Sequence, residues 1–270
     1  MRSLDYTFLK QTIYEECLGL TEIIYDLRAK ESLRINDNKR FFEALRQTAR
    51  IETVRSSNAI EGIVTTADRL EDLIEERITP ESHGENEILG YRMALDEIYS
   101  EFAPELSEDY IKHVHFLIME HSSREAGHYK TRNNWIKERD ERGRIKVRFV
   151  PVSAGETGAA MEQLLMAYRE ARQDSGINQL LLSICFVVDF LCIHPFMDGN
   201  GRVSRLLTSL LLQDAGFDIG KYISVDKKID VYKGNYYRAL SESSKGWHEC
   251  RNTYEPFITL MLQIIYQCYK

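Results

Sequence analysis

HPFMDGNGRVSR, residues 194–205, joins a polar loop to a helix and decides how the rest of the chain is interpreted. Gly199 and Gly201 flank Asn200 and permit positive φ angles, so that backbone N–H groups can converge on an anion. Apolar residues then recur at helical spacing, at Val203, Leu206, Leu207, Leu210 and Leu211. The loop therefore opens onto a helix N-terminus, where phosphate groups bind best.

The polar side chains of this stretch suit the transfer of a phosphate-containing group. Arg202 and Arg205 are three residues apart in the first helical turn, so both guanidinium groups could reach successive groups of one polyphosphate. Such a pair suits a nucleoside triphosphate better than a monophosphate. Asp198 offers an oxygen ligand for a Mg²⁺ ion that bridges two phosphates. His194 is placed to act as a general base, because imidazole titrates nearest to neutral pH.

The stretch also matches the Fic (filamentation induced by cAMP) motif, HPFx[DE]GNGRxxR, at every specified position, so the chain resembles Fic proteins. The resemblance implies AMPylation: His194 deprotonates a Ser, Thr or Tyr hydroxyl of a target protein, the hydroxyl attacks the α-phosphorus of ATP, and pyrophosphate leaves. It also implies that Asp198 binds Mg²⁺. The residues implied to hold the phosphates of ATP are Gly199, Asn200, Gly201, Arg202 and Arg205.

A second motif, Ser57-Asn58-Ala59-Ile60-Glu61-Gly62, matches the inhibitory motif [ST]xxxE[GN] of the same family. Ser57 and Glu61 are four residues apart on one helix face, and Gly62 permits a left-handed helix end. In relatives the glutamate pairs with the second arginine of the catalytic motif, which corresponds to Arg205. A carboxylate there would exclude the γ-phosphate of ATP or misalign its α-phosphorus. The resemblance thus implies autoinhibition, whereas the motif taken alone is also typical of a solvent-exposed helix face.

Composition limits the other function classes. The 270 residues include 35 Lys and Arg against 42 Asp and Glu, a net charge of −7 without a basic block, which argues against nucleic acid as a partner. Five cysteines without CxxC or CxxH spacing suggest neither a disulfide framework nor a zinc site. The most apolar stretch, residues 180–193, is too short to span a bilayer and contains Asp189. No signal peptide is evident, so we expect a cytoplasmic protein without a membrane partner.

Helical periodicity dominates the chain, and we predict an all-α fold with one β-hairpin. The predicted organisation is an N-terminal helical region with the inhibitory motif (1–87), a Fic-type catalytic core (88–225) and C-terminal helices (226–270). The N-terminal helices could also form a homodimer interface, which the sequence does not distinguish from a buried lobe.

The hairpin is predicted at residues 135–150, where Ile145, Val147 and Phe149 alternate with Lys146 and Arg148. In Fic proteins a flap at this position pairs with the backbone of the target protein and holds its hydroxyl over the active site. A solvated hairpin that uses its charges to prevent edge-to-edge pairing is an equal alternative. The preceding segment, 127–130, ends in Lys130, where arginine is commoner in the family, and no role is assigned to it.

Other polar and aromatic residues receive weaker assignments. Tyr236 and Tyr237 resemble a family segment that forms a wall of the adenine pocket, although a tyrosine pair on a helix more often packs in a core. His113, His115 and His121 lack a carboxylate or cysteine at ligand spacing, so we interpret them as surface or core histidines rather than as a metal site.

Three alternative functions remain open from the sequence. Glu61 could orient a water molecule that removes AMP from modified proteins, the donor could be another phosphate-containing compound, or the chain could be a non-catalytic sensor of nucleotides.

Overall fold

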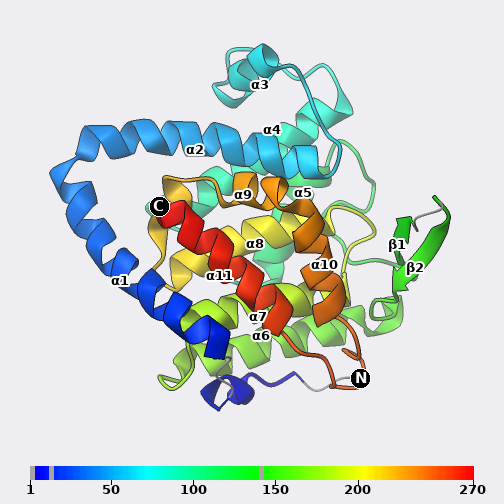
Figure 1. Ribbon diagram of the computed structural model, residues 1–270. Helices are drawn as coiled ribbons and strands as arrows, with labels where there is room; N and C mark the ends of the chain where they lie inside the picture. Colours follow the sequence, from blue (N-terminus) through cyan, green and yellow to red (C-terminus); the bar gives the residue numbers. More distant parts are fainter. Residues whose placement is uncertain (1–3, 12–14, 140–142) are drawn as a thin grey trace.

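The computed structural model describes residues 4–11, 15–139 and 143–270. Within them the chain forms eleven α-helices, three short 3-10 helices and a two-stranded antiparallel sheet (Figure 1). The predicted all-α fold with one β-hairpin is therefore confirmed. In chain order the elements are η1 (Thr7–Lys10), α1 (Glu15–Asp37), α2 (Lys39–Ile60), α3 (Ala67–Ile74), α4 (His83–Ile98), α5 (Glu108–Met119), β1 (Ile136–Arg139), β2 (Ile145–Phe149), η2 (Ala154–Glu156), α6 (Thr157–Gln173), α7 (Gln179–Ile193), α8 (Asn200–Asp214), η3 (Asp218–Lys221), α9 (Val225–Val231), α10 (Lys233–Ser243) and α11 (Glu255–Tyr269).

Helices α7 and α8 form the centre of the bundle and pack against each other. Almost every side chain of α7 is buried, as its apolar composition requires, and the side chain of Asn178 caps its first turn by accepting from the N–H groups of Leu180 and Leu181. Helix α6 packs against α7, while α4 and α5 pack against α8. The short loop between the two central helices, residues 194–199, is thus held on a rigid scaffold.

The one carboxylate inside the apolar part of α7, Asp189, is fully buried. It accepts hydrogen bonds from Tyr6 Oη at 2.8 Å, Trp247 Nε1 at 2.6 Å and Tyr254 Oη at 2.9 Å. A buried charge needs such donors, and these come from segments near both ends of the chain. Among the described helices, none is long and apolar enough to cross a membrane.

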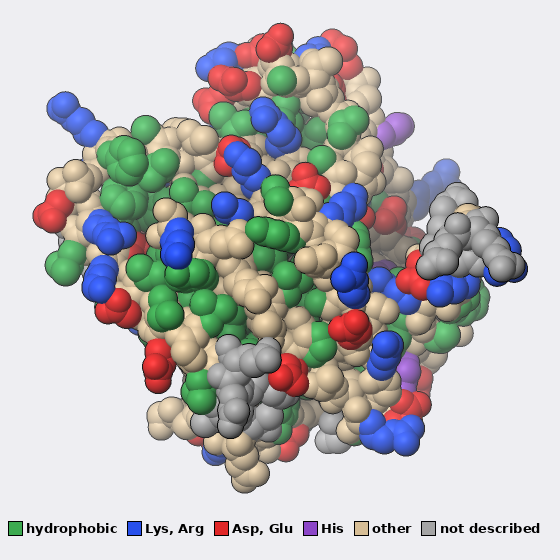
Figure 2. Space-filling view, viewed as in Figure 1, with side chains coloured by type: hydrophobic (Ala, Val, Ile, Leu, Met, Phe, Trp, Pro, Cys, Tyr) green, Lys and Arg blue, Asp and Glu red, His purple; other side chains and the backbone are tan. Residues whose placement is uncertain are grey.

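The long helices α1 and α2 wrap around the outside of the bundle (Figure 1). Helix α1 packs on α11, and α2 packs on α9 and α4 so that its C-terminal end reaches the start of α8. Figure 2 shows apolar side chains on the surface of these two helices, and Leu33 and Phe41 are 65% and 61% exposed. The same view shows acidic and basic side chains interspersed. Homodimer formation through the N-terminal helices stays a prediction.

Candidate functional site

The loop between α7 and α8 begins at His194, which ends α7 with a left-handed φ of 52°. Its shape is fixed by the side chain of Asn200, whose Oδ1 accepts from the N–H of Phe196 at 3.0 Å and whose Nδ2 donates to the carbonyl of Phe196 at 2.8 Å. Both ends of the Asn200 amide are therefore used to hold the loop. This contact positions the loop rather than presenting the Asn200 side chain to a ligand.

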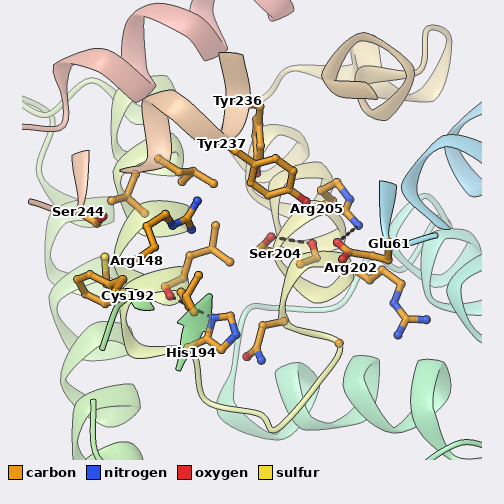
Figure 3. Close-up of a pocket in the computed structure, with 18 of the residues that line it drawn as sticks. Glu61, Arg148, Cys192, His194, Arg202, Ser204, Arg205, Tyr236, Tyr237 and Ser244 are labelled. Atoms are coloured by element: carbon orange, nitrogen blue, oxygen red, sulfur yellow. Dashed lines mark hydrogen bonds and ion pairs between the residues drawn. The ribbon is translucent and has the colours of Figure 1, made fainter. Parts of the chain in front are cut away.

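The imidazole of His194 lies at the cavity beside this loop (Figure 3). Its Nδ1 is 3.3 Å from the carbonyl of Leu191, which can only accept, so we assign the proton to Nδ1 and the lone pair to Nε2. Burial lowers the pKa of His194 to about 4, and the positive charges of Lys130 and Arg148 act in the same direction. At neutral pH the ring is thus uncharged and able to accept a proton.

Lys130, which was assigned no role in the sequence analysis, binds the C-terminal end of α7, which carries this imidazole. It is 3% exposed, and its Nζ donates to the carbonyls of Ile193 at 3.1 Å and His194 at 2.9 Å and to Asn134 Oδ1 at 2.9 Å. The Asn134 Nδ2 donates in turn to the carbonyl of Phe196 at 2.8 Å. A cation at the C-terminus of a helix is favourable, and here it also fixes the backbone that carries His194.

His115 supports the other side of the loop as a buried, neutral side chain. Its ring stacks on Phe196 with centroids 3.8 Å apart, its Nδ1 accepts from the N–H of Gly127 at 2.9 Å, and its Nε2 is 3.2 Å from the carbonyl of Asp198. Burial lowers the pKa of His115 to about 4. The interpretation of His115 as a core histidine is confirmed, while His113 and His121 are exposed and contact Glu97 and Glu120.

The two glycines of the loop differ in conformation. Gly199 has the predicted positive φ, 78°, but Gly201 lies inside α8 with a helical backbone, so the prediction for Gly201 was wrong. Gly201 is needed for space instead, because a Cβ atom there would lie 2.3 Å from Oε1 of Glu61. The carboxylate of Glu61 thus occupies the N-terminal turn of α8, which is the position where an anion is most favourable.

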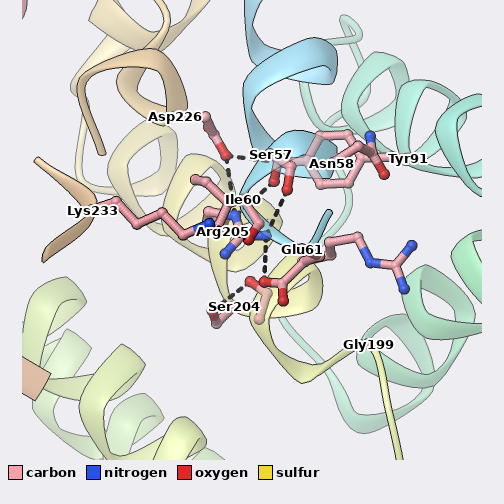
Figure 4. Close-up of polar contacts among 12 residues, drawn as sticks. Ser57, Asn58, Ile60, Glu61, Tyr91, Gly199, Ser204, Arg205, Asp226 and Lys233 are labelled. Carbon is pink, nitrogen blue, oxygen red and sulfur yellow. Dashed lines mark hydrogen bonds and ion pairs between the residues drawn. The ribbon is translucent and has the colours of Figure 1, made fainter. Parts of the chain in front are cut away.

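Glu61 follows directly after the last residue of α2, and Gly62 has the predicted left-handed φ of 81°. Arg205 Nη2 donates to Glu61 Oε1 at 2.9 Å and to the carbonyl of Ser57 at 2.9 Å, and Arg205 Nε donates to Ser57 Oγ at 2.7 Å (Figure 4). The side chain of Arg205 is 1% exposed and that of Glu61 is 33% exposed. The structure therefore brings all three residues of the Ser57–Glu61–Arg205 prediction together.

A further carboxylate lies on the opposite side of Arg205 and was not singled out in the sequence. Asp226, near the start of α9, is 3.6 Å from Arg205 Nε and accepts from Tyr91 Oη at 3.1 Å. Burial raises the pKa of Asp226, and the positive charge of Arg205 opposes that rise. Arg205 is thus contacted by carboxylates from two separate helical segments, and loss of Glu61 alone would not leave it without a counter-ion.

Arg202 points to a different element, so the two guanidinium groups do not converge in this structure. It forms an ion pair with Glu87 of α4, and its Nη2 is 3.2 Å from Met119 Sδ. The side chains of Arg202 and Glu87 are 3% and 12% exposed. Glu87 was missed because nothing in its helical segment distinguishes it from an ordinary surface glutamate.

The cavity that these residues line has a volume of about 190 Å³ (Figure 3). Its polar end holds His194, Asp198, the first turn of α8 and Glu61. Its other end holds Tyr237 of α10 and residues of the hairpin. Further lining residues are Val188, Leu191, Cys192, Met197, Tyr236, Leu240 and Ser244. Asp198 is exposed at the mouth, and its Oδ1 accepts from the N–H of Gly199 at 2.6 Å.

The predicted hairpin pairs β1 with β2 in antiparallel register; residues 140–142 of the predicted 135–150 segment lie outside the described residues. Ile136 pairs with Phe149 and Lys137 with Val147, so a β-bulge leaves Arg148 without an opposite residue. The predicted alternation along β2 therefore breaks at Arg148. Both Arg148 and Phe149 line the cavity.

Comparison with known proteins finds a family model that matches part of this chain. The Fic/DOC family model matches residues 105–212. A Fido domain-containing protein of Dictyostelium discoideum is 29% identical over 90 residues, which cover 33% of this chain and 59% of that protein. A protein from Nematostella vectensis named "Protein adenylyltransferase Fic" is 25% identical over 179 residues, which cover 63% of this chain and 39% of that protein. The chain thus matches only about two fifths to three fifths of the length of these relatives.

A solved structure has the same fold over almost the whole chain. The crystal structure of a Fic family protein from Desulfovibrio desulfuricans G20 superposes with a TM-score of 0.78 at 23% identity, covering 96% of this chain and 74% of that one. The match includes the N-terminal helices as well as the segment matched by the family model.

Proposed function

This chain carries a Fic/DOC family domain, and we propose that it is an autoinhibited protein adenylyltransferase that transfers AMP from ATP to a Ser, Thr or Tyr hydroxyl of a target protein. The observation that carries the proposal is the position of Glu61, whose carboxylate lies against Gly201 and binds Arg205 beside an uncharged His194. These residues form one cavity with a helix N-terminus at its polar end.

In the proposed reaction His194 Nε2 accepts the proton of the target hydroxyl. The hydroxyl oxygen forms a bond to the α-phosphorus of ATP, and the bond from that phosphorus to the bridging oxygen of the β-phosphate breaks, so that pyrophosphate leaves. The lowered pKa of His194 keeps the ring available as a base at neutral pH. Lys130 and Asn134 hold the backbone of the loop and so fix the direction of the imidazole.

The phosphates would bind at the first turn of α8, with Gly199 and Gly201 allowing close approach and Arg202 and Arg205 supplying positive charge. Asp198 fits a Mg²⁺ site, because its carboxylate is exposed at the cavity mouth and one or two protein carboxylates with substrate phosphates are a usual Mg²⁺ ligand set. A bound Mg²⁺ ion would neutralise charge on the phosphates. Tyr237 would form a wall of the adenine site, and the 135–150 hairpin would dock the target backbone.

Inhibition would act through the phosphate end of the cavity. The carboxylate of Glu61 lies where a phosphate oxygen would otherwise approach Gly201, and two anions cannot occupy that position together. A charge-assisted hydrogen bond such as that of Arg205 to Glu61 contributes about 1.5–3 kcal/mol. The inhibited state would therefore be favoured modestly, and a partner or ligand that displaces Glu61 could open it.

Autoradiography with α-³²P-ATP and Mg²⁺ tests this proposal. Wild type, Glu61→Gly and Glu61→Gly/His194→Ala are incubated with and without cell lysate. We expect protein labelling by Glu61→Gly that is lost in the double variant. If Glu61→Gly binds ATP but labels nothing, the transferase proposal fails for this donor, and another donor or a nucleotide-sensing role takes its place.

Removal of AMP is a second candidate activity. The carboxylate of Glu61 lines the same cavity as His194 and is partly exposed to it, so it could orient a water molecule toward a bound AMP-protein. Incubating a labelled target with wild type and with Glu61→Gln tests this directly. Loss of label with wild type alone would support it, and stable label with both would contradict it.

A further inference from the structure

Arg148 of β2 is a cation in the cavity that the proposed mechanism does not use. Among the residues that the structure describes it makes no hydrogen bond or ion pair, and its Nε is buried without a partner. Burial lowers the pKa of its guanidinium below the usual range. The negative charge of Glu138, which is paired with Lys146, opposes this shift. Burying a hydrogen-bond donor without an acceptor is unfavourable, so the arrangement indicates that a ligand supplies the missing acceptor of Arg148 Nε.

The β-bulge in the hairpin explains how Arg148 reaches the cavity. In a regular strand neighbouring side chains point to opposite faces, so Arg148 and Phe149 could not both face the same cavity. The bulge inserts Arg148 between the paired residues Val147 and Phe149 and allows both side chains to line it. Phe149 is fixed by stacking on His248, with centroids 5.4 Å apart. The strand is thus held in a conformation that directs Arg148 inward.

The surroundings of Arg148 separate it from the phosphate end. Figure 3 places it on the far side of the cavity from Arg202 and Glu61, close to Tyr237 and Cys192. The N-terminal turn of α8 and its two arginines already provide positive charge for the phosphates. A nucleotide with its phosphates on α8 would therefore extend its base toward Tyr237 and Arg148.

We propose that Arg148 is a specificity-determining residue that hydrogen-bonds the base of the donor nucleotide. This inference rests on the proposed nucleotidyl transfer. A guanidinium group is a planar fork of donors, so it recognises acceptor atoms on a base edge: two adjacent acceptors, N7 and O6, on guanine, but only N7 beside an amino group on the corresponding edge of adenine. Arg148 consequently contributes to binding of every base with an accessible acceptor, and most to binding of guanine.

Binding assays in the Glu61→Gly background test this without requiring catalysis. Dissociation constants are measured by calorimetry for ATP, GTP, CTP, UTP and inorganic tripolyphosphate with Mg²⁺. The variants are Arg148→Met, which removes the donors, and Arg148→Lys, which keeps the charge without the fork. Lys146→Met is the matched control, because Lys146 lies on the same strand, is exposed and pairs with Glu138. Thermal unfolding of each variant establishes that it is folded.

We expect Arg148→Met to raise the dissociation constant of GTP by a factor at least about five times larger than for the least affected nucleotide. This corresponds to the discrimination of about 1–3 kcal/mol that a bidentate arginine provides. Tripolyphosphate affinity should not change, and Arg148→Lys should behave like Arg148→Met. An equal loss for all four nucleotides and tripolyphosphate would identify a phosphate contact and overturn the inference. Unchanged affinities of Arg148→Met for all four nucleotides would also overturn it. If Glu61→Gly itself binds no nucleotide, the proposed function fails together with this inference. If it binds nucleotides and only the expected effect of Arg148→Met is missing, the inference fails alone.

Discussion

The two ends of the cavity differ in how their positive charges are satisfied. At the α8 end Arg205 is bonded to Ser57 and Glu61, and Arg202 is paired with Glu87. At the hairpin end Arg148 has no such partner among the described residues. A ligand at the α8 end must displace a carboxylate before it binds, whereas a ligand at the hairpin end gains a buried donor. The described conformation thus obstructs phosphates more strongly than it obstructs a base.

Removing the proposed general base, His194, should have the largest effect and should leave both ends of the cavity intact. We expect the transfer rate of Glu61→Gly/His194→Ala to be about 10²–10⁴-fold lower than that of Glu61→Gly, since this is the usual contribution of general-base catalysis. Its affinity for ATP should remain within a factor of a few, since His194 is uncharged at neutral pH and forms no ion pair with a phosphate. Initial rates and calorimetry check the two parts. A parallel loss of affinity would show that His194 binds the nucleotide instead.

Removing the obstruction at the α8 end should have the next largest effect. We expect Glu61→Gly to raise transfer by about 10- to 100-fold, because releasing a charge-assisted hydrogen bond changes the free energy by about 1.5–3 kcal/mol. Ser57→Ala is the matched control: it removes one donor–acceptor pair from Arg205 but keeps the backbone carbonyl contact and Glu61. Its rate should rise much less. Equal activation by both changes would indicate that displacement of α2 matters rather than the carboxylate.

A smaller effect is expected from replacing Lys130, which positions the loop between α7 and α8. Lys130→Met removes the donor to the carbonyl of Ile193 and leaves the carbonyl of His194 with only the longer contact from Asn134 Nδ2 at 3.3 Å, which should lower the free energy of unfolding by about 1–3 kcal/mol. It also removes a positive charge that lowers the pKa of His194, so the acidic limb of the pH–rate profile should move to higher pH. Lys130→Arg should restore most of the lost stability and should return the acidic limb of the pH–rate profile most of the way to its wild-type position. An unchanged profile in Lys130→Met would reduce Lys130 to a purely structural role.

The sequence predicted the α8 end of the site better than the hairpin end. His194, Asp198, Arg205 and Glu61 belong to short motifs whose chemistry is local, and the structure places them around one cavity. Their residue types and spacing sufficed, because one loop and one helix end carry most of the geometry. The prediction of the fold succeeded for a similar reason, since buried helices leave a strong periodic pattern.

Contacts between distant segments could not be predicted in the same way. Glu87 and Asp226 reach the arginines only because α4 and α9 pack beside α8, and neither residue has a local signal. The inward direction of Arg148 depends on a one-residue bulge that the alternating pattern conceals. For Gly201 the requirement is not a dihedral angle but the space taken by Glu61, which comes from another helix.

The last prediction concerns the pH dependence of stability, which follows from the two buried, uncharged histidines, His194 and His115. Burial lowers the pKa of His194 and of His115 to about 4, whereas an unfolded histidine titrates near its ordinary value of 6.5. Between these values the unfolded chain binds more protons than the folded chain, so the free energy of unfolding should fall as the pH is lowered from about 6.5 toward 4. Urea denaturation at pH 7, 6 and 5 measures this. His194→Ala should flatten the dependence, and replacement of the exposed His113 by alanine should affect it less. A dependence equally steep in wild type and in His194→Ala would show that folding does not lower the pKa of His194, and the assignment of a lowered pKa would then be wrong.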